Sequence, residues 1–519
     1  MEKSYQDPAM PQDFQAGEVD AADQTAARHI LAIDQGTSSS RAVVFDRNAR
    51  PLAASQQEFT QYYPRPGWVE HDPEEIWGSV VAVTREAIAA SRVPSGKFAA
   101  LGITNQRETT LVWDRVSGRC LHPAIVWQDR RTASYCRGLI DDGLEALVSE
   151  RTGLRIDPYF SASKLVWILD NVPEARRLAN AGKLAFGTVD SFLIWRLTGG
   201  QVHATDATNA SRTMLFNIHT QQWDRELLDV LDVPENLLPE VMNCADDFGV
   251  TDTSVMGFSV PIAGVAGDQQ AALVGQAGFE PGMTKSTYGT GCFVITNTGH
   301  EVLRSKNKLL STVAYRLKGT VTYGIEGSIF VAGSAIQWLR DELKVIASAA
   351  QTEAIAIETG VVEHVHVVPA FAGLGAPYWD PDARGAILGL SRDTGIAEIV
   401  TAALQAVAYQ TKDLVNAMAD DGITPSIIRV DGGMVANDWL LQFMADILGL
   451  EVERPTNVES TVLGAALLAG FQVGMFESTA ALADVWQRDA IFVPQMDSER
   501  RGRLYEAWMH AVARVRSRS

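Results

Sequence analysis

Two short stretches of the chain place polar groups on glycine-containing turns between apolar runs. In LAIDQGTSSSRAVVFD, Asp34 ends an apolar run, and Gly36 and Thr37 follow it; in KSTYGTGCFVITN, Thr290 stands between two glycines. Such turns expose backbone N–H groups and hydroxyls that can hold phosphate oxygens. A carboxylate beside phosphates can hold Mg²⁺, usually through water, because Mg²⁺ takes only one or two carboxylates. We therefore expect Asp34 to lie near a metal.

A second carboxylate, Asp268, follows a glycine-rich apolar run and precedes small helix-forming residues in VPIAGVAGDQQAALVG. It could be the N-cap of that helix. It could equally be a catalytic base, since phosphoryl transfer needs positioned phosphates, a metal and a group that accepts the proton of the attacking hydroxyl. The sequence leaves both interpretations open. It contains no G-x-x-x-x-G-K-[ST] motif, which excludes a Walker-type phosphate loop.

The elements that position these residues can be predicted from local patterns. Residues 31–33 and 42–45 are predicted to form a hairpin around Gly36, and residues 285–297 a second hairpin around Thr290. The two hairpins indicate a weak internal repeat of two related domains, although Gly-Thr pairs also recur by chance. Residues 98–114 are predicted to form a strand, a polar turn carrying Arg107 and Glu108, and another strand.

Two helices have clear start signals. In HDPEEIWGSVVAVTREAIAA, Asp72 is the predicted N-cap, Pro73 the first helical residue and Glu75 the partner that closes a capping box. In VDGGMVANDWLLQFMADILG, a strand leads through two glycines to a helix that begins at Asn437 or Asp438. A helix N-terminus of this kind can bind an anion or a nucleotide, or it can simply connect a strand to a helix.

Composition sets broader limits. At 519 residues the chain is too long for one hydrophobic core, and its net charge of −19 disfavours binding to nucleic acid or to an anionic membrane. We expect no membrane insertion, because no 18 apolar residues run together. The four cysteines form no C-x-x-C pair and suit a reducing compartment, so we expect a cytoplasmic protein. Residues 1–27 are predicted to form a disordered acidic tail rather than a signal peptide.

Ten stretches, in order from about His29 to near the C-terminus, carry a resemblance to a known family. They are DQGTSSSRAVVFD, YPRPGWVEHDPEEIW, GITNQRETTLVWD, IVWQDRRTA, DPYFSASK, TNASRTMLFNIHT, AGDQQAALVGQ, TYGTGCF, AGLGAPYWDP and VDGGMVAND. Together they resemble the FGGY carbohydrate kinases, members of the actin, hexokinase and 70-kilodalton heat-shock ATPase superfamily. The resemblance implies an α/β fold of two ribonuclease H-like domains, each a mixed sheet flanked by helices, with an inter-domain cleft. It implies a first domain at 28–277, with the polyol site and the metal–phosphate hairpin, and a nucleotide-binding second domain at 278–519.

The resemblance also implies an activity: ATP- and Mg²⁺-dependent phosphorylation of glycerol to sn-glycerol 3-phosphate in glycerol catabolism, with Asp268 as general base. The residues that it implies for the substrate pocket are Arg107, Glu108, Trp127, Tyr159, Asp268, Gln269 and Phe293. Those that it implies for the nucleotide are Thr37, Ser38, Ser39, Arg41, Thr290, Gly333, Gln337, Gly433 and Asn437, with Asp34 near the metal. We also expect a homo-oligomer, either a dimer or a tetramer.

The chemistry of the polyol set fits this reading independently. Arg107 only donates hydrogen bonds and an ionised Glu108 only accepts them, so the pair can bind adjacent hydroxyls of a neutral polyol. Trp127 and Phe293 could cover its C–H face or simply pack in a core. Two other functions stay open. One is an FGGY kinase acting on a pentulose or similar sugar, and the other is an actin-like or chaperone-like ATPase, which would need no polyol pocket.

Overall fold

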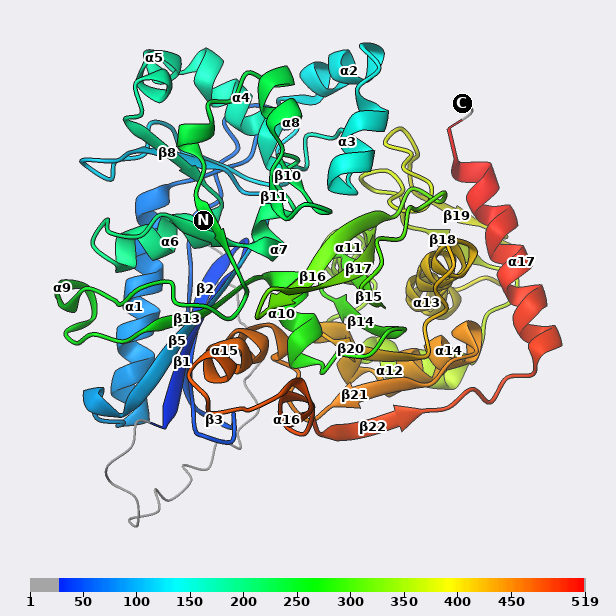
Figure 1. Cartoon of the computed structure of the whole chain (residues 1–519). Helices are drawn as coiled ribbons and strands as arrows, with labels where there is room; N and C mark the ends of the chain where they lie inside the picture. Colours follow the sequence, from blue (N-terminus) through cyan, green and yellow to red (C-terminus); the bar gives the residue numbers. More distant parts are fainter. Residues whose placement is uncertain (1–27, 518–519) are drawn as a thin grey trace.

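The computed structural model describes residues 28–517, so the predicted tail at 1–27 lies outside the described residues. Two mixed sheets, each flanked by helices, form the body of the molecule (Figure 1). The two-domain α/β prediction is therefore confirmed at the level of architecture. The proposed boundary between residues 277 and 278 stays a prediction.

The first sheet has five strands in the order β13-β5-β1-β2-β3. They are β1 (His29–Gln35), β2 (Ser39–Phe45), β3 (Pro51–Glu58), β5 (Phe98–Asn105) and β13 (Ile262–Gly267). Strand β1 runs antiparallel to β2 and parallel to β5, and β5 runs parallel to β13. The hairpin predicted around Gly36 is confirmed as β1–β2.

The second sheet has seven strands in the order β16-β17-β15-β14-β20-β21-β22. They are β14 (Met283–Tyr288), β15 (Cys292–Gly299), β16 (Leu310–Leu317), β17 (Thr320–Ile329), β20 (Ile427–Asp431), β21 (Val452–Pro455) and β22 (Arg488–Phe492). Strand β14 is antiparallel to β15 and parallel to β20, which is parallel to β21. The hairpin predicted around Thr290 is thus confirmed as β14–β15.

The predicted internal repeat is present in the strand order. Strands β17-β15-β14-β20-β21 follow the order and directions of β3-β2-β1-β5-β13. The two glycine-containing hairpins therefore hold equivalent places in two related sheets. A parallel strand lies beside each hairpin, β5 in the first sheet and β20 in the second, and each of these strands leads to residues of the candidate site.

Two helices cover opposite faces of the first sheet. Helix α1 (Pro73–Ser91) packs on the face that carries Leu31 and Ile33, and α15 (Ser460–Gln472) packs on the face that carries Ile30 and Ala32. Successive strand residues point to opposite faces, which explains the alternation. Helix α15 also packs closely against α10 (Asp268–Gly275), because a Cβ at Gly464 would collide with the carbonyl of Ala271. A helix from the C-terminal half of the chain thus covers one face of the first sheet.

The N-terminus of α1 was predicted only in part. Asp72 caps the helix by accepting a hydrogen bond from the backbone N–H of Glu74 at 2.8 Å, as expected. The capping box through Glu75 is wrong. Its carboxylate instead accepts from the Thr60 backbone N–H at 2.9 Å and from the Tyr62 hydroxyl at 2.5 Å. A partner brought close by the fold outcompetes the local one.

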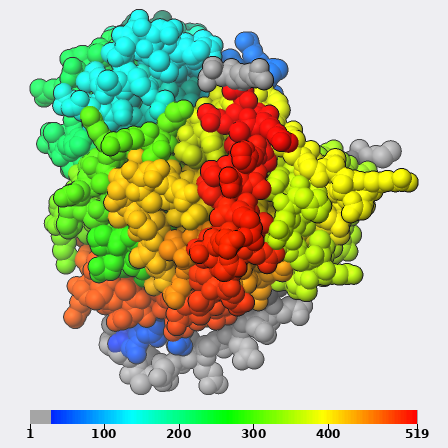
Figure 2. All heavy atoms as spheres, turned by 90° about the vertical axis from the view of Figure 1, so that its right-hand side faces the viewer, coloured from blue at the N-terminus to red at the C-terminus, as the bar shows by residue number. Residues whose placement is uncertain are grey.

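The second sheet is covered by α11 (Gly333–Asp341), α12 (Gln351–Thr359), α13 (Ile396–Asp420), α14 (Asp438–Leu448) and α17 (Ser498–Val515). Figure 2 shows α17, in red, crossing the face of this part of the molecule. Its Tyr505 hydroxyl and Trp508 indole donate to the two oxygens of Asp413 in α13, at 2.6 and 3.0 Å. A helix at the end of the described chain is therefore fixed to the core.

Smaller elements complete the described chain. The remaining strands are β4 (Glu70–His71), β6 (Leu111–Asp114), β7 (Ala124–Ile125), β8 (Leu184–Gly187), β9 (Ala204–Asp206), β10 (Phe216–Asn217), β11 (Gln222–Trp223), β12 (Glu240–Met242), β18 (His366–Val368) and β19 (Ala386–Leu388). The remaining α-helices are α2 (Ala133–Asp141), α3 (Glu145–Thr152), α4 (Ser161–Asn171), α5 (Ala175–Asn180), α6 (Val189–Leu197), α7 (Ala207–Ala210), α8 (Arg225–Val230), α9 (Thr253–Met256) and α16 (Thr479–Ala483). Within residues 28–517, no helix has both the length and the apolar character to cross a membrane.

Candidate active site

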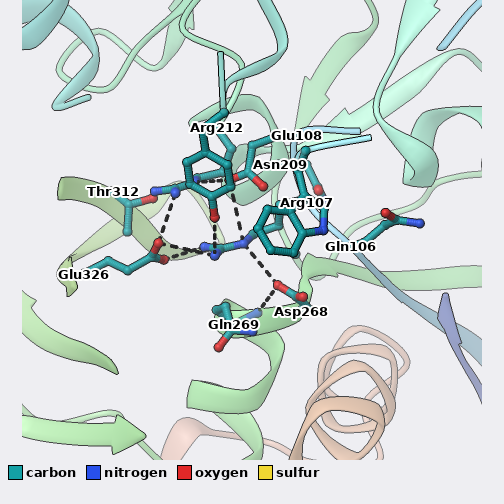
Figure 3. A network of polar contacts seen from close by, with 12 residues as sticks. Gln106, Arg107, Glu108, Asn209, Arg212, Asp268, Gln269, Thr312 and Glu326 are labelled. Atoms are coloured by element: carbon teal, nitrogen blue, oxygen red, sulfur yellow. Dashed lines mark hydrogen bonds and ion pairs between the residues drawn. The ribbon is translucent and has the colours of Figure 1, made fainter. Parts of the chain in front are cut away.

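A buried network of arginines and carboxylates lies between the two sheets (Figure 3). Arg107 and Glu108 occupy the predicted turn after β5, and both side chains are only 2% exposed. The Nε of Arg107 lies 3.0 Å from Asp268 Oδ1, and its Nη1 lies 2.5 Å from Glu326 Oε2. Arg212 places Nε 2.6 Å from Glu108 Oε1 and Nη2 3.0 Å from Glu326 Oε1. The polar groups predicted from sequence are thus held in a wider ionic network.

Aromatic rings adjoin this network. The ring of Trp127 lies 5.7 Å from that of Tyr159 and 6.2 Å from that of Phe293, both in edge-to-face orientation. The Tyr159 hydroxyl is 3.5 Å from Nη2 of Arg107. The structure therefore brings aromatic side chains from three separate segments into contact with one another, and Tyr159 joins them to the buried arginine.

Asp268 is the most accessible carboxylate of the network. It is the first residue of α10, whose N-cap is Gly267, so the N-cap interpretation of Asp268 is wrong. Its side chain is 29% exposed, against 2% for Arg107. Oδ1 accepts the backbone N–H of Gln269 at 2.6 Å and also faces Arg107. Both contacts use the same oxygen, which leaves Oδ2 available for a substrate proton.

The β1–β2 hairpin touches the aromatic wall directly. Thr37 Oγ1 accepts a hydrogen bond from Trp127 Nε1 at 2.9 Å. The neighbouring serines have partners in and just after β3, since the Ser38 carbonyl accepts the Phe59 N–H at 3.2 Å and Ser39 Oγ accepts from Gln56 at 3.0 Å. The predicted polyol and phosphate regions are therefore in contact.

Charged side chains gather close to the turn of this hairpin. Asp34 and Arg41 stand opposite each other in the β1–β2 register, and Arg41 pairs with Glu459 at 2.6 Å. Burial, together with the negative charges of Asp268 and Glu459, raises the pKa of Asp34 to about 7. In the described part of the chain, no group of three or more His, Cys, Asp or Glu side chains could form a metal site. The excess negative charge around Asp34 fits a cation held by one carboxylate together with water and phosphate.

The β14–β15 hairpin is joined to α11 through its backbone. The Thr290 carbonyl accepts the N–H groups of Ala332 and Ser334 at 3.0 and 3.1 Å, and the Gly289 carbonyl accepts that of Gly333 at 3.0 Å. Gln337 lies one helical turn further along α11 and is exposed. Thr290, on the turn of the hairpin, therefore lies next to the N-terminus of α11, the helix that carries Gly333 and Gln337.

The glycine pair after β20 leads first into a short 3₁₀ helix, Gly433–Ala436, and then into α14. Asn437 is the N-cap of α14, because its side chain accepts the N–H of Leu440 at 2.9 Å. Its amide also donates to Thr352 Oγ1 at 3.3 Å. Of the two starts considered from sequence, Asn437 is the correct one.

Four charged residues of the site were missed from sequence: Glu326, Arg212, Lys285 and Glu459. Three of them had a weak signal, since Glu326 is a lone charge in the apolar strand YGIEGSIF, and Arg212 and Lys285 lie in or beside the motifs TNASRTM and TYGTG. Lys285 is fully buried and its ammonium donates to Gln269 Oε1. Burial lowers the pKa of Lys285, although Asp431 and Asp268 oppose that effect.

Comparison with known families gives two matches along the chain. Residues 29–275 match the N-terminal domain of the FGGY family of carbohydrate kinases, and residues 284–473 match its C-terminal domain. The chain belongs to the FGGY family of carbohydrate kinases. The FGGY resemblance found in the sequence motifs is thereby confirmed.

Individual relatives of this FGGY kinase span almost its whole length. It is 62% identical to a glycerol kinase of Ectopseudomonas mendocina and 61% identical to glycerol kinase 1 of Pseudomonas aeruginosa, in each case over 95% of this chain and 99% of the relative. A crystal structure of Plasmodium falciparum glycerol kinase with ADP has a TM-score of 0.90 at 35% identity, covering 95% of this chain and 99% of that one. A gluconate kinase of Lactobacillus acidophilus, at 21% identity and a TM-score of 0.85, shares the fold.

Proposed function

We propose that the protein transfers the γ-phosphoryl group of ATP to the terminal hydroxyl of glycerol, giving sn-glycerol 3-phosphate. The observation that carries the proposal is the hydrogen bond from Trp127 to Thr37, which joins the aromatic pocket to the β1–β2 hairpin. In-line transfer requires the acceptor and the phosphates to lie side by side. Relatives of about 60% identity that are named glycerol kinases support the choice of acceptor.

The polyol would bind between the aromatic rings and the ionic network. Trp127, Tyr159 and Phe293 would cover its C–H groups and exclude water, while Arg107, Glu108 and Gln269 would meet its hydroxyls. Of the contacts that Arg107 makes with its Nη2 atom, the one to the Tyr159 hydroxyl is the longest, at 3.5 Å. That contact is the one that a substrate hydroxyl would most readily replace.

Asp268 would act as the general base. Its Oδ1 is held by the Gln269 N–H and by Arg107, so the carboxylate has a fixed orientation. Its Oδ2 would accept the proton of the terminal hydroxyl as that hydroxyl attacks phosphorus. A base fixed in this way loses little entropy when the substrate binds.

The nucleotide would be held by both hairpins and by the N-terminal ends of α11 and α14, which cover the second sheet. The residues proposed for this role are Thr37, Ser38, Ser39, Arg41, Thr290, Gly333, Gln337, Gly433 and Asn437. Asp34 would hold Mg²⁺ through water, and the ion would neutralise charge on the transferring phosphoryl group. We further propose that the two domains divide near residue 277, and that the enzyme is a cytoplasmic homo-oligomer.

A coupled assay of ADP formation tests the proposal. We expect ATP turnover to depend on glycerol and on Mg²⁺, with far lower rates on D-xylulose or gluconate. Equal turnover without any acceptor would instead favour an actin-like ATPase. A preference for D-xylulose or gluconate over glycerol would overturn the proposed substrate while keeping the kinase class.

A further inference from the structure

Glu326 stands at the centre of the ionic network, although it belongs to the other sheet. It lies in β17, with a side chain 1% exposed, whereas Arg107 follows β5 and Arg212 follows α7. Its Oε2 accepts Arg107 Nη1 at 2.5 Å, and its Oε1 accepts Arg107 Nη2 at 3.3 Å and Arg212 Nη2 at 3.0 Å. One carboxylate of the second sheet therefore holds both arginines (Figure 3).

The two contacts to Arg107 set the orientation of its guanidinium. A carboxylate that accepts from both Nη atoms of a planar guanidinium fixes that plane and the direction of Nε. In this orientation Nε faces Asp268 at 3.0 Å, and the outer edge of Nη2 faces the Tyr159 hydroxyl. The group proposed to orient the base is thus itself oriented from the opposite sheet.

The charge balance favours an ionised Glu326. Burial alone would raise the pKa of Glu326, but the positive charges of Arg107 and Arg212 outweigh burial and hold that pKa below its usual value. Without this carboxylate, Arg212 keeps Glu108 as its ionic partner. Arg107 keeps Asp268 at 3.0 Å and Glu108 only at 3.9 Å. Arg107 would then have no carboxylate at its Nη atoms, and Nη1 would keep only the neutral amide oxygen of Gln270 at 3.2 Å.

We propose that Glu326 is a positioning residue for polyol binding, which acts by holding Arg107 and so makes the polyol site depend on the approach of the two sheets. The inference rests on the proposed function, because it assigns Arg107 to that site. Glu326 touches neither substrate in this account. Movement of β17 away from the first sheet would remove the carboxylate that holds both Nη atoms of Arg107, and would leave Arg107 with its contacts to Asp268 at 3.0 Å and Gln270 at 3.2 Å.

The test compares Glu326→Gln and Glu326→Asp with a matched control. Asp413→Asn is the control, because Asp413 is also a buried carboxylate, on helix α13 that covers the second sheet, and its partners are Tyr505 and Trp508 of α17 together with Tyr378. The readouts are the KM for glycerol, the KM for ATP, kcat and the melting temperature, measured on the full-length enzyme.

We expect Glu326→Gln to raise the glycerol KM about tenfold or more and to leave the ATP KM within about twofold, since a charge-assisted pair is lost beside one substrate only. Glu326→Asp, which keeps the charge, should recover part of the loss. Asp413→Asn should lower the melting temperature without changing either KM. A glycerol KM within twofold of wild type in Glu326→Gln would overturn the inference, as would equal increases in both KM values.

The two proposals fail separately. If Glu326→Gln does not fold, Glu326→Asp decides: a selective rise in glycerol KM supports the inference, and an unchanged KM overturns it. If the wild-type enzyme phosphorylates another polyol and not glycerol, the proposed function alone fails. The same KM comparison is then made with that polyol.

Discussion

The β1–β2 and β14–β15 hairpins have the same place in related sheets but differ in chemistry. Each turn is closed by a 2.9 Å backbone bond, from Gly36 to Ser39 in the first and from Gly289 to Gly291 in the second. The first carries Asp34 and Arg41 on facing strands, with Glu459 beside them. The second has no charged residue between positions 286 and 299. Under the proposed function, one turn would therefore act through its side chains and the other through its backbone.

The close packing of the second turn has a structural reason. A Cβ at Gly291 would lie 2.6 Å from the carbonyl oxygen of Ile329, so only glycine lets this turn approach the end of β17. The first turn has more room, since a Cβ at Gly36 would lie 3.2 Å from the Ser39 carbonyl oxygen. Under the proposed function, the first hairpin would bind the metal and phosphate charge, and the second would bind phosphate oxygens through N–H groups.

We expect the largest effect from a substitution of Asp268, the proposed general base. Asp268→Asn keeps an oxygen to accept from Arg107 and Gln269, so we expect a folded protein that binds glycerol normally. Turnover should fall by at least ~10²-fold, because the amide cannot accept the hydroxyl proton. The measurement is kcat together with glycerol binding by calorimetry. Near-normal turnover would exclude Asp268 as the general base.

In the β1–β2 hairpin, we expect a substitution to act by removing a charge. Asp34→Asn should lower kcat by about tenfold or more at low Mg²⁺ and raise the Mg²⁺ concentration needed for half-maximal activity. The glycerol KM should change little, since Asp34 would not contact the polyol. A Mg²⁺ titration of the rate gives the result, with the surface variant Asp141→Asn as a control of equal charge. If the wild-type protein, Asp34→Asn and Asp141→Asn all show the same Mg²⁺ dependence, the metal lies elsewhere.

In the β14–β15 hairpin, we expect a substitution to act by displacing the backbone of the turn. Gly291→Ala should displace the turn from Ile329 and raise the ATP KM by about fivefold or more, since overpacking typically costs about 1–3 kcal/mol and 1.4 kcal/mol is about tenfold. The glycerol KM should stay within twofold of wild type. Gly78→Ala is the control, because a Cβ at Gly78 in α1 meets no atom within 4 Å. A larger change in glycerol KM than in ATP KM would contradict the division of roles.

The smallest expected effect is a change in melting temperature that depends on pH. Because the pKa of Asp34 is raised to about 7 in the folded state, the unfolded chain loses this proton at lower pH than the folded chain does. Folding is therefore penalised increasingly as pH rises from about 4 to about 7, and fully above that range.

In the absence of Mg²⁺, Asp34→Asn should remove this penalty and raise the melting temperature by about 1–3 °C at pH 8, with a smaller gain at pH 5.5. Differential scanning fluorimetry at both pH values measures the difference. A gain that is larger at pH 5.5 than at pH 8 would contradict the raised pKa.

Local sequence patterns determined much of the structure around the site. Both hairpins, the Asp72 cap and the Asn437 cap follow from glycine turns, capping side chains and hydrophobic period, all of which act over a few residues. The polyol and nucleotide residues came instead from motif resemblance. Their positions in the structure agree with a shared site, and their roles stay predictions.

Only the tertiary structure decided which distant groups meet. Arg107 and Glu326 are 219 positions apart, and nothing in the local sequence around either residue indicates their pairing. In the same way, α15 covers one face of the first sheet from the C-terminal half of the chain, and Glu75 bonds to Thr60 rather than closing a capping box. Caps and turns depend on neighbours along the chain. Buried ion pairs depend on how two sheets pack, because a charge removed from water must find its partner wherever the fold supplies one.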